Sequence, residues 1–370
     1  MENGELTNAL VARSSRVGVH IARTVFLLLA LGAVALLIVA VLDLVSGASE
    51  GASELVVWAR LAFLLIDALG CLTIVVFDYT IATRQARLAA RATLAVVVFA
   101  LVFDIAHSGI AANQLYYALQ LVLIIGFVTV SDRELKSGHV LTQPWEISTD
   151  TSRRNFIPLN FFNVFWVFFV ASFAGLIIEL VWHVLTTGEY QDRAGLLWGP
   201  FSPIYGFGAL LMTVALNRWW NRSKTVIFLV AGTIGAAFEF AVSWWMEKAF
   251  GIVAWDYSGT FLNIDGRTNA AYFCAWGLLG LVWIRLLLPD VLKVVDRIPL
   301  RWRAMITVIA AMLMIVDGAM TLIALDRWND RHTGVAPSGQ IERYIDARYD
   351  DEFMTTRFQT MEIDTARSSH

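Results

Sequence analysis

Several ionisable side chains lie inside strongly apolar stretches in the second half of the chain. Glu179 and His183 are four residues apart, and Glu239, Ser243 and Glu247 repeat at the same interval. Because residues four apart share one face of a helix, each set would present its polar groups together. An ionisable group inside a membrane helix costs roughly 2.5–3.5 kcal/mol, so it needs a partner or a function. Carboxylates and imidazoles placed in this way could act as acids and bases or bind a polar ligand.

A run rich in glycine, proline and aromatic residues separates these two sets, at residues 195–208. Pro200 and Pro203 lack a backbone N–H, so they would leave carbonyl groups unpaired in an apolar segment. Gly206 and Gly208 would allow a neighbouring helix or a ligand to approach closely. Irregular backbone at membrane depth is tolerated only where protein or a water-filled cavity covers it. The segment could be broken or re-entrant, and the basic residues that follow it favour a full crossing.

A polar loop after residue 250 supplies the remaining candidates and ends with Arg267. This arginine is the natural charge partner for Glu179, Glu239 or Asp256. Together with the residues above, the loop completes the set of candidate cavity and ligand-binding residues: Glu179, His183, Pro200, Pro203, Tyr205, Glu239, Glu247, Trp255, Asp256, Tyr257, Asn263 and Arg267.

Two interpretations of this set remain open. Any single member could be a structural residue, such as a buried Glu239–Arg267 pair that fixes helix register. Four tryptophans are typical of an aromatic belt at the membrane interface: Trp198, Trp244, Trp245 and Trp255. For the set as a whole we favour a polar cavity, because all its members converge on one layer near one side of the membrane.

The composition places the chain among polytopic membrane proteins. Hydrophobic residues make up 58% of the chain and charged residues only 16%, with a mean hydropathy of +0.63. Soluble domains carry about 25% charge. Apolar stretches of about 20 residues, each long enough to span a bilayer, recur about nine times. We therefore expect an all-α transmembrane bundle with segments near 25–45, 55–77, 92–110, 115–131, 160–186, 195–216, 225–249, 269–288 and 304–326.

The distribution of lysine and arginine predicts the orientation. Arginines precede the first apolar segment, the 46–54 loop has none, and the next loop again carries several. This alternation continues along the chain, and basic loops stay on the cytoplasmic side. We expect the N-terminus inside and the C-terminus outside, which places the candidate residues near the outer face.

The polarity of the connections predicts the domain organisation. Residues 1–131 form an N-terminal four-helix membrane region, and residues 132–158 form a cytoplasmic linker. Residues 159–326 form a five-helix module, and residues 327–370 form a charged extracytoplasmic tail. In the first region Arg60 is expected to pair with Asp104 or Glu54, and Asp67 needs a hydrogen-bond donor.

Searches for established catalytic and cofactor motifs find none. Cys71 and Cys274 both lie in apolar runs, which excludes a disulfide framework and a paired-cysteine redox or metal motif. The chain has no phosphate-binding loop, no paired-histidine zinc motif and no dinucleotide fingerprint. We expect no cofactor and no metal. The net charge of −3 gives no basic excess, so we expect a lipid bilayer as partner and no nucleic acid.

The order of the motifs resembles a bacterial membrane family described as "putative ABC-transporter type IV". The resemblance rests on Trp198-Gly199-Pro200-Phe201-Ser202-Pro203-Ile204-Tyr205-Gly206-Phe207-Gly208, followed by Glu239, the Glu247–Gly251 unit, Trp255-Asp256-Tyr257-Ser258, the Asn263–Arg267 unit and Trp276-Gly277. It covers about residues 160–325. Thr268 and Asn269 are more polar than the family pattern leads us to expect.

The resemblance implies a permease-like protein of the bacterial plasma membrane whose activity is poorly defined. Because the chain has no nucleotide-binding motif, any ATPase would be a separate subunit. One alternative is a membrane-embedded enzyme that acts on a lipid or envelope precursor, with Glu239, Glu247, Asp256 or His183 as acid or base and Arg267 holding an anionic head group. Another is a non-catalytic partner or sensor subunit. A transporter requires a path past Glu239, whereas the enzyme requires a shallow groove open to lipid.

Overall fold

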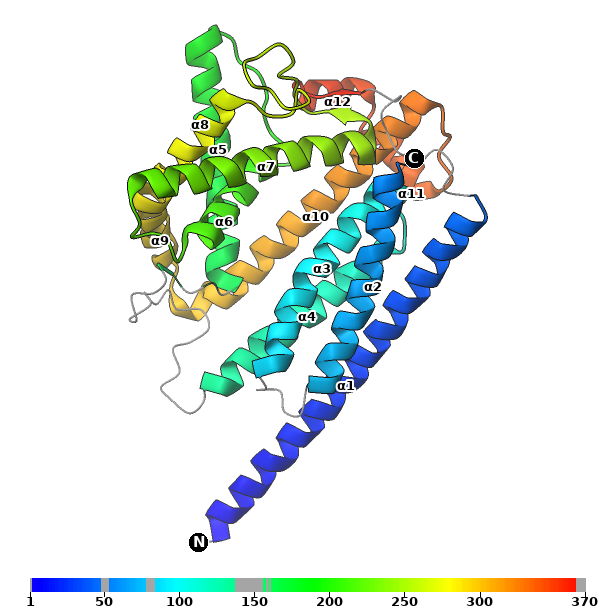
Figure 1. Ribbon diagram of the computed structural model, residues 1–370, viewed down its shortest axis with the longest axis vertical. Helices are drawn as coiled ribbons and strands as arrows, with labels where there is room; N and C mark the ends of the chain where they lie inside the picture. The colour runs from blue at the N-terminus through cyan, green and yellow to red at the C-terminus, as the bar shows by residue number, and fades with distance from the viewer. Residues whose placement is uncertain are drawn as a thin grey trace. The chain divides into compact units, whose positions relative to one another are not determined.

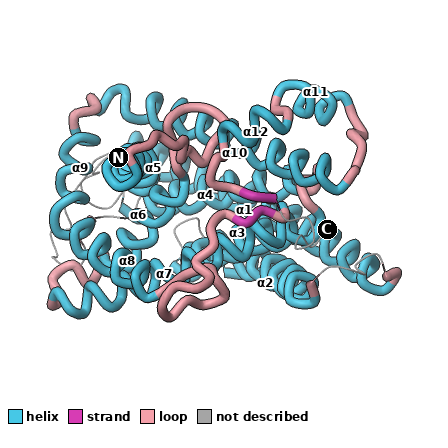
Figure 2. Tube along the Cα trace, turned by 90° about the horizontal axis from the view of Figure 1, so that it is seen from above, coloured by secondary structure: helices cyan, strands magenta, loops and turns pink. Residues whose placement is uncertain are grey.

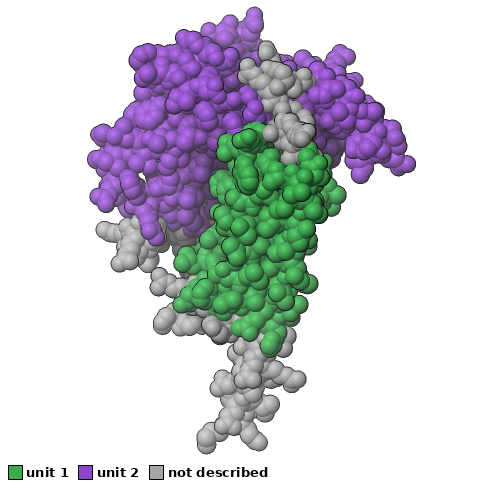
Figure 3. Space-filling view, turned by 45° about the vertical axis from the view of Figure 1, so that its right-hand side comes forward, with its two compact units in different colours: residues 1–141, 369–370 green, residues 142–368 purple. Residues whose placement is uncertain are grey.

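The computed structural model of the protein describes residues 2–47, 53–77, 84–136, 156–157, 159 and 161–363. The described chain is almost entirely helical (Figure 1), and its two strands are two residues long each (Figure 2). The expected all-α class is confirmed. The chain divides into two compact units, residues 1–141 with 369–370 and residues 142–368, which are coloured separately in Figure 3.

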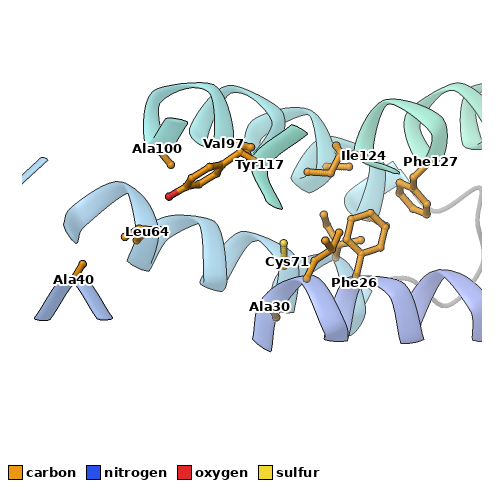
Figure 4. Packing of buried hydrophobic residues seen from close by; sticks show 14 residues of the cluster. Phe26, Ala30, Ala40, Leu64, Cys71, Val97, Ala100, Tyr117, Ile124 and Phe127 are labelled. Carbon is orange, nitrogen blue, oxygen red and sulfur yellow. The ribbon is translucent and has the colours of Figure 1, made fainter. Parts of the chain in front are cut away.

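The first unit is a bundle of four helices: α1 (Glu2–Val45), α2 (Glu54–Phe77), α3 (Arg84–Ser108) and α4 (Gln114–Lys136). Each helix packs against the next in sequence. Leu64, Tyr117 and Ile124 are fully buried between them, and the Phe26 and Phe127 rings meet edge to face at 5.0 Å (Figure 4). These apolar contacts hold the bundle together.

Buried polar groups in the first unit bind one another. The Arg60 guanidinium lies 2.9 Å from the Asp104 carboxylate, which confirms one of the two expected partners of Arg60. Asp67 accepts a hydrogen bond from Gln120 at 2.5 Å, so the donor that it requires is supplied by α4. Such pairing offsets the cost of placing charge in an apolar bundle.

The second unit contains the remaining elements. Its strands are β1 (Ile252–Val253) and β2 (Glu362–Ile363). Its helices are α5 (Phe161–Thr187), α6 (Pro203–Leu216), α7 (Lys224–Phe250), α8 (Ala270–Val282), the π-helical turn η1 (Trp283–Leu287), α9 (Leu288–Asp296), α10 (Leu300–Thr333), α11 (Gln340–Arg348) and α12 (Asp351–Arg357).

The elements α8, η1 and α9 follow one another without a break. Pro289 has no N–H to donate within the helix, and the turn before it widens, so that the N–H of Leu288 bonds the carbonyl of Trp283 five residues back. The apolar segment expected near residues 269–288 therefore becomes one longer, locally widened helix.

Within the described residues, six helices are long and apolar enough to cross a membrane, which makes the protein a multi-pass integral membrane protein. These spans are Val19–Val45, Glu54–Phe77, Gln85–Ser108, Phe161–Thr187, Lys224–Phe250 and Met305–Thr333. The apolar part of α4 and the whole of α6 are shorter. The expected number of about nine crossings and the orientation of the termini stay predictions.

The helix in segment 195–216 begins later than the sequence predicts. Residues 195–202 are not helical, and α6 starts at Pro203. Gly199 has a φ of 68°, a left-handed conformation that suits glycine, and Pro200 follows it directly. Proline is well placed in the first turn of a helix, where its missing N–H has no partner to lose. The two prolines therefore mark the end of the loop and the start of the helix.

The segment after α10 folds back onto the second unit. β2 pairs antiparallel with β1, with Ile363 opposite Ile252 (Figure 2). Arg327 and Arg331 near the end of α10 bind Asp346 of α11, at 2.7 and 2.8 Å. Some charged side chains of this segment therefore form ion pairs with the end of α10, and others face solvent.

Candidate functional site

The Gly–Pro loop, residues 193–202, is held by backbone hydrogen bonds to two helices. The N–H of Trp198 donates to the Asp317 carboxylate of α10 at 3.1 Å, and the N–H of Leu197 donates to the Thr321 hydroxyl at 3.0 Å. The N–H of Ser202 donates to the carbonyl of Ser172 on α5 at 3.0 Å. These bonds satisfy backbone groups that no helix satisfies, as irregular backbone inside a membrane protein requires.

Glu179 and His183 lie on one face of α5, as their spacing predicts, and share one cation. Arg193 donates to Glu179 at 2.9 Å and lies 3.0 Å from Nδ1 of His183. Tyr205 of α6 also hydrogen-bonds Glu179. A Cβ on Gly175 would lie 2.4 Å from the Tyr205 side chain, so glycine lets α5 and α6 meet at this point. The partner of Glu179 is therefore Arg193 and not Arg267.

Arg267 binds the last turns of α7. Its guanidinium lies 2.8 Å from Glu247 and 2.9 Å from Asp265, and it also reaches Ser243 at 3.5 Å. Both Arg267 and Glu247 are buried. The indole N–H of Trp255 donates to the carbonyl of Arg267 at 2.8 Å. The loop of residues 251–269, called the α7–α8 loop below, is thus fastened to α7 by a buried ion pair.

Glu239 lies two turns before Glu247 on α7, and its environment differs. Its side chain is buried, and its two carboxylate oxygens accept hydrogen bonds from the Tyr257 hydroxyl at 3.1 Å and the Thr268 hydroxyl at 2.9 Å. Trp276 of α8 also hydrogen-bonds it. Among the described residues, no lysine, arginine or histidine forms an ion pair with it. Neutral donors alone surround this carboxylate.

Asp256 and Asn263 shape the α7–α8 loop itself. Asp256 accepts from the N–H of Ser258 at 2.7 Å, and Asn263 accepts from the N–H of Gly266 at 3.2 Å. Gly266 has a φ of 67°, and a Cβ there would lie 2.6 Å from the Asp256 carboxylate. These two residues therefore fold the turn that presents Arg267 and Thr268 to α7.

Trp276 fills the place where three helices meet. A Cβ on Gly235 of α7 would lie 2.2 Å from the Trp276 ring, and one on Gly208 of α6 would lie 2.8 Å from it. The space beside these glycines is therefore occupied by the Trp276 indole and not by a ligand. Gly208 of the Gly–Pro motif therefore has a packing role.

The expected outward polar cavity is not confirmed. The two best-formed hollows in the described part of the chain are shallow and apolar, and both lie on the surface of α5. One is lined by Ile177, Ile178, Val181, Trp182 and Leu185. Pro200 is exposed, whereas Glu239, Glu247 and Arg267 are buried. The buried candidates bond to one another and to the loops, and neither hollow touches any candidate.

No metal centre is formed within the described residues, since no group of three or more histidines, cysteines or acids is close enough to hold an ion. The oxygens around Glu239 come from one carboxylate, one hydroxyl of threonine and one of tyrosine. Two of these oxygens belong to hydroxyl groups that donate to the carboxylate.

Several residues of the site lie outside the predicted cavity set. Asp317 is an ionisable residue of an apolar segment whose partner, the N–H of Trp198, lies 119 residues away, and Arg193 is a loop residue for which no partner was predicted. Thr268 and Asn269 carried a signal, since they are more polar than the resemblance predicts. Thr268 binds Glu239, and Asn269 caps α8 by accepting from the N–H of Tyr272 at 2.9 Å.

The fold and the site together define a multi-pass helical membrane protein with a buried polar network between its helices and the α7–α8 loop. Residues 166–322 match the model of the family described as "Putative ABC-transporter type IV", which confirms the resemblance over this segment. The match runs from α5 to α10 and contains all the candidate residues. A search of curated proteins and a search of solved structures each gave no match.

Proposed function

We propose that the protein is a permease-like membrane subunit of a bacterial transport system. The observation that carries this proposal is the family match over residues 166–322, which contains the buried polar network around Glu239 and Arg267. Ionisable residues in membrane helices that face the protein interior can mark solute or ion pathways. Because the sequence has no nucleotide-binding motif, any ATPase that drives this transport would be a separate subunit.

On this proposal, the protein has a closed conformation, in which the α7–α8 loop covers the polar network. The α7–α8 loop lies on α7 through Arg267, Thr268 and Tyr257, so a polar path beside Glu239 opens only when these contacts break. With the N-terminus inside, this loop lies on the outer side and acts as the outer closure. Alternating access requires such a closure on each side of the membrane.

The test compares a deletion strain with its complemented parent. Small molecules and lipids are measured separately in cells and in the medium, over several growth conditions. We expect at least one chemically unaltered compound to change its distribution between cells and medium, and the gene to restore that distribution. Accumulation of a lipid precursor together with loss of its product would support the enzyme instead. Identical profiles in every condition would overturn the transport role.

Complementation with variants tests the site. Arg267→Ala is expected to restore the distribution poorly at normal protein levels, because it releases the α7–α8 loop. Lys293→Ala is the matched control, since Lys293 forms an exposed pair with Asp290. Full restoration by Arg267→Ala at the parental protein level would contradict a role of this network in transport.

A further inference from the structure

Glu239 and Glu247 offer a comparison within one helix. Both carboxylates are buried on the same face of α7. Glu247 has Arg267 at 2.8 Å and Lys248 at 3.7 Å, whereas the donors to Glu239 from the described part of the chain are hydroxyl and indole groups. Glu247 therefore has cations beside it. A buried carboxylate without a cation can lower its free energy by binding a proton.

The titratable groups on the elements around Glu239 are engaged elsewhere or are neutral. Arg267 binds Glu247 and Asp265, and Asp256 accepts from the loop backbone. Asp317 of α10 accepts from the Gly–Pro loop. The other titratable groups on the packed elements include Tyr205 on α6, Tyr272 and Cys274 on α8, and Arg303, Asp326, Arg327, Asp330, Arg331 and His332 on α10. None of these groups forms a hydrogen bond with Glu239. Among the described residues, the one titratable group that does so is Tyr257 of the α7–α8 loop.

Tyr257 connects the buried carboxylate to an exposed group. Its ring stacks on that of Tyr272 with centroids 4.4 Å apart, and Tyr272 is 40% exposed. Burial, together with hydrogen bonding to Tyr272 and the charge of Glu239, raises the pKa of the Tyr257 hydroxyl. Tyr257 therefore keeps its proton and acts as a hydrogen-bonding bridge and not as a base.

We propose that Glu239 is a proton-binding site, reached from the protein surface through Tyr257 and Tyr272. A proton from solvent adds to the Glu239 carboxylate and cancels its charge, and on release it returns to solvent by the same route. The neutral acid is a weaker acceptor for Tyr257 and Thr268 than the carboxylate, so proton uptake loosens the α7–α8 loop. This inference goes beyond transport, because proton binding can be measured without any transported solute.

The test is an infrared pH titration of the full-length protein in lipid nanodiscs. The C=O stretching band of a protonated carboxyl group should grow as the pH falls, and Glu239→Gln should remove that component. Asp67→Asn removes another buried carboxylate with neutral partners, in the first unit, so any component that it removes should be separate, and the Glu239 component should remain. Thr268→Val removes one hydrogen bond to the charged form, which should raise the proton affinity about tenfold.

Two outcomes would overturn the proposal. One is a titrating band of unchanged amplitude in Glu239→Gln, with both proteins showing the same unfolding temperature. The other is a band that neither shifts in frequency nor changes its midpoint in Tyr257→Phe and Thr268→Val. If Glu239→Gln does not fold, the second outcome tests the proposal by itself. Neither outcome bears on whether the protein transports a solute, so the two proposals fail independently.

Discussion

Arg267 is the residue on which the contact between the α7–α8 loop and α7 depends most. Replacing it with alanine leaves Glu247 buried without its main partner and removes the bond to Asp265. Breaking one side of a buried pair costs about 3–5 kcal/mol. We predict a marked fall in the thermal unfolding temperature of Arg267→Ala in detergent.

A double variant distinguishes the effect of an unpaired buried charge on stability from the effect of lost side-chain packing. In Arg267→Met with Glu247→Met, no buried carboxylate is left unpaired, because the remaining partner Asp265 is exposed, so the double variant should regain most of the stability. Equal stability of Arg267→Ala and wild type would show that the pair is not buried as described. Lys293→Ala, which alters an exposed pair, should change the unfolding temperature little.

At Gly235 the addition of one methyl group would disturb the packing of α7 against α8. A Cβ there would lie 2.2 Å from the Trp276 ring, too close for any real contact. We predict that Gly235→Ala lowers the free energy of unfolding by about 1–3 kcal/mol through overpacking. Gly318→Ala on α10 is the control, because a Cβ there meets nothing within 4 Å. Equal effects of the two substitutions on thermal unfolding would contradict the close approach of α7 and α8.

At the scale of elements, the tail holds the Gly–Pro loop through Arg357. Its guanidinium donates to the carbonyls of Leu196 and Gly199, at 2.9 and 2.7 Å, and lies 2.8 Å from Asp192. We predict that Arg357→Ala increases hydrogen–deuterium exchange in residues 189–202. Arg343→Ala, on an exposed position of α11, should leave that exchange unchanged. Unchanged exchange in both variants would contradict the contact.

The attachment of α11 should depend on acid pH. Burial alone would raise the pKa of Asp346, but hydrogen bonds from Arg327 and Arg331 outweigh it, and the pKa of this carboxyl is lowered. A group with a lowered pKa stabilises the folded state above its ordinary value, about 4, and loses this contribution as the pH falls through the lowered value. We predict that wild type loses stability below about pH 4.

Asp346→Asn isolates this dependence. It should be less stable than wild type at neutral pH, and the difference should shrink as the pH falls below about 4. Asp290→Asn, in an exposed pair, is the control. The measurement is the thermal unfolding temperature of the three proteins across the acid range. A gap between Asp346→Asn and wild type that stays constant with pH would count against the ion pair.

At the scale of the molecule, the distribution of lysine and arginine among the loops predicts how the protein is oriented in the membrane. In a background of Cys71→Ala with Cys274→Ala, single cysteines replace the exposed Phe261 and Lys293. We predict that a membrane-impermeant maleimide labels the Phe261→Cys protein in intact cells and the Lys293→Cys protein only after permeabilisation. The reverse pattern would place the α7–α8 loop inside and exclude it as an outer closure.

The sequence predicts which segments are helical better than it predicts which residues bind. Hydropathy located most helices, and the four-residue spacing placed Glu239, Ser243 and Glu247 on one face of α7. The partner of Arg267 could not be predicted, because the choice among nearby acids depends on how the α7–α8 loop lies on α7. The start of α6 at Pro203 was missed because residues 195–202 are apolar enough to resemble a membrane helix.

The pairing of β1 with β2 has a consequence for biosynthesis. β2 and Arg357 follow α10, so the ribosome makes them after every candidate membrane helix. Until they arrive, the carbonyls of Leu196 and Gly199 and the edge of β1 lack their partners. The contacts that the tail makes in the second unit therefore form only after these helices have been synthesised.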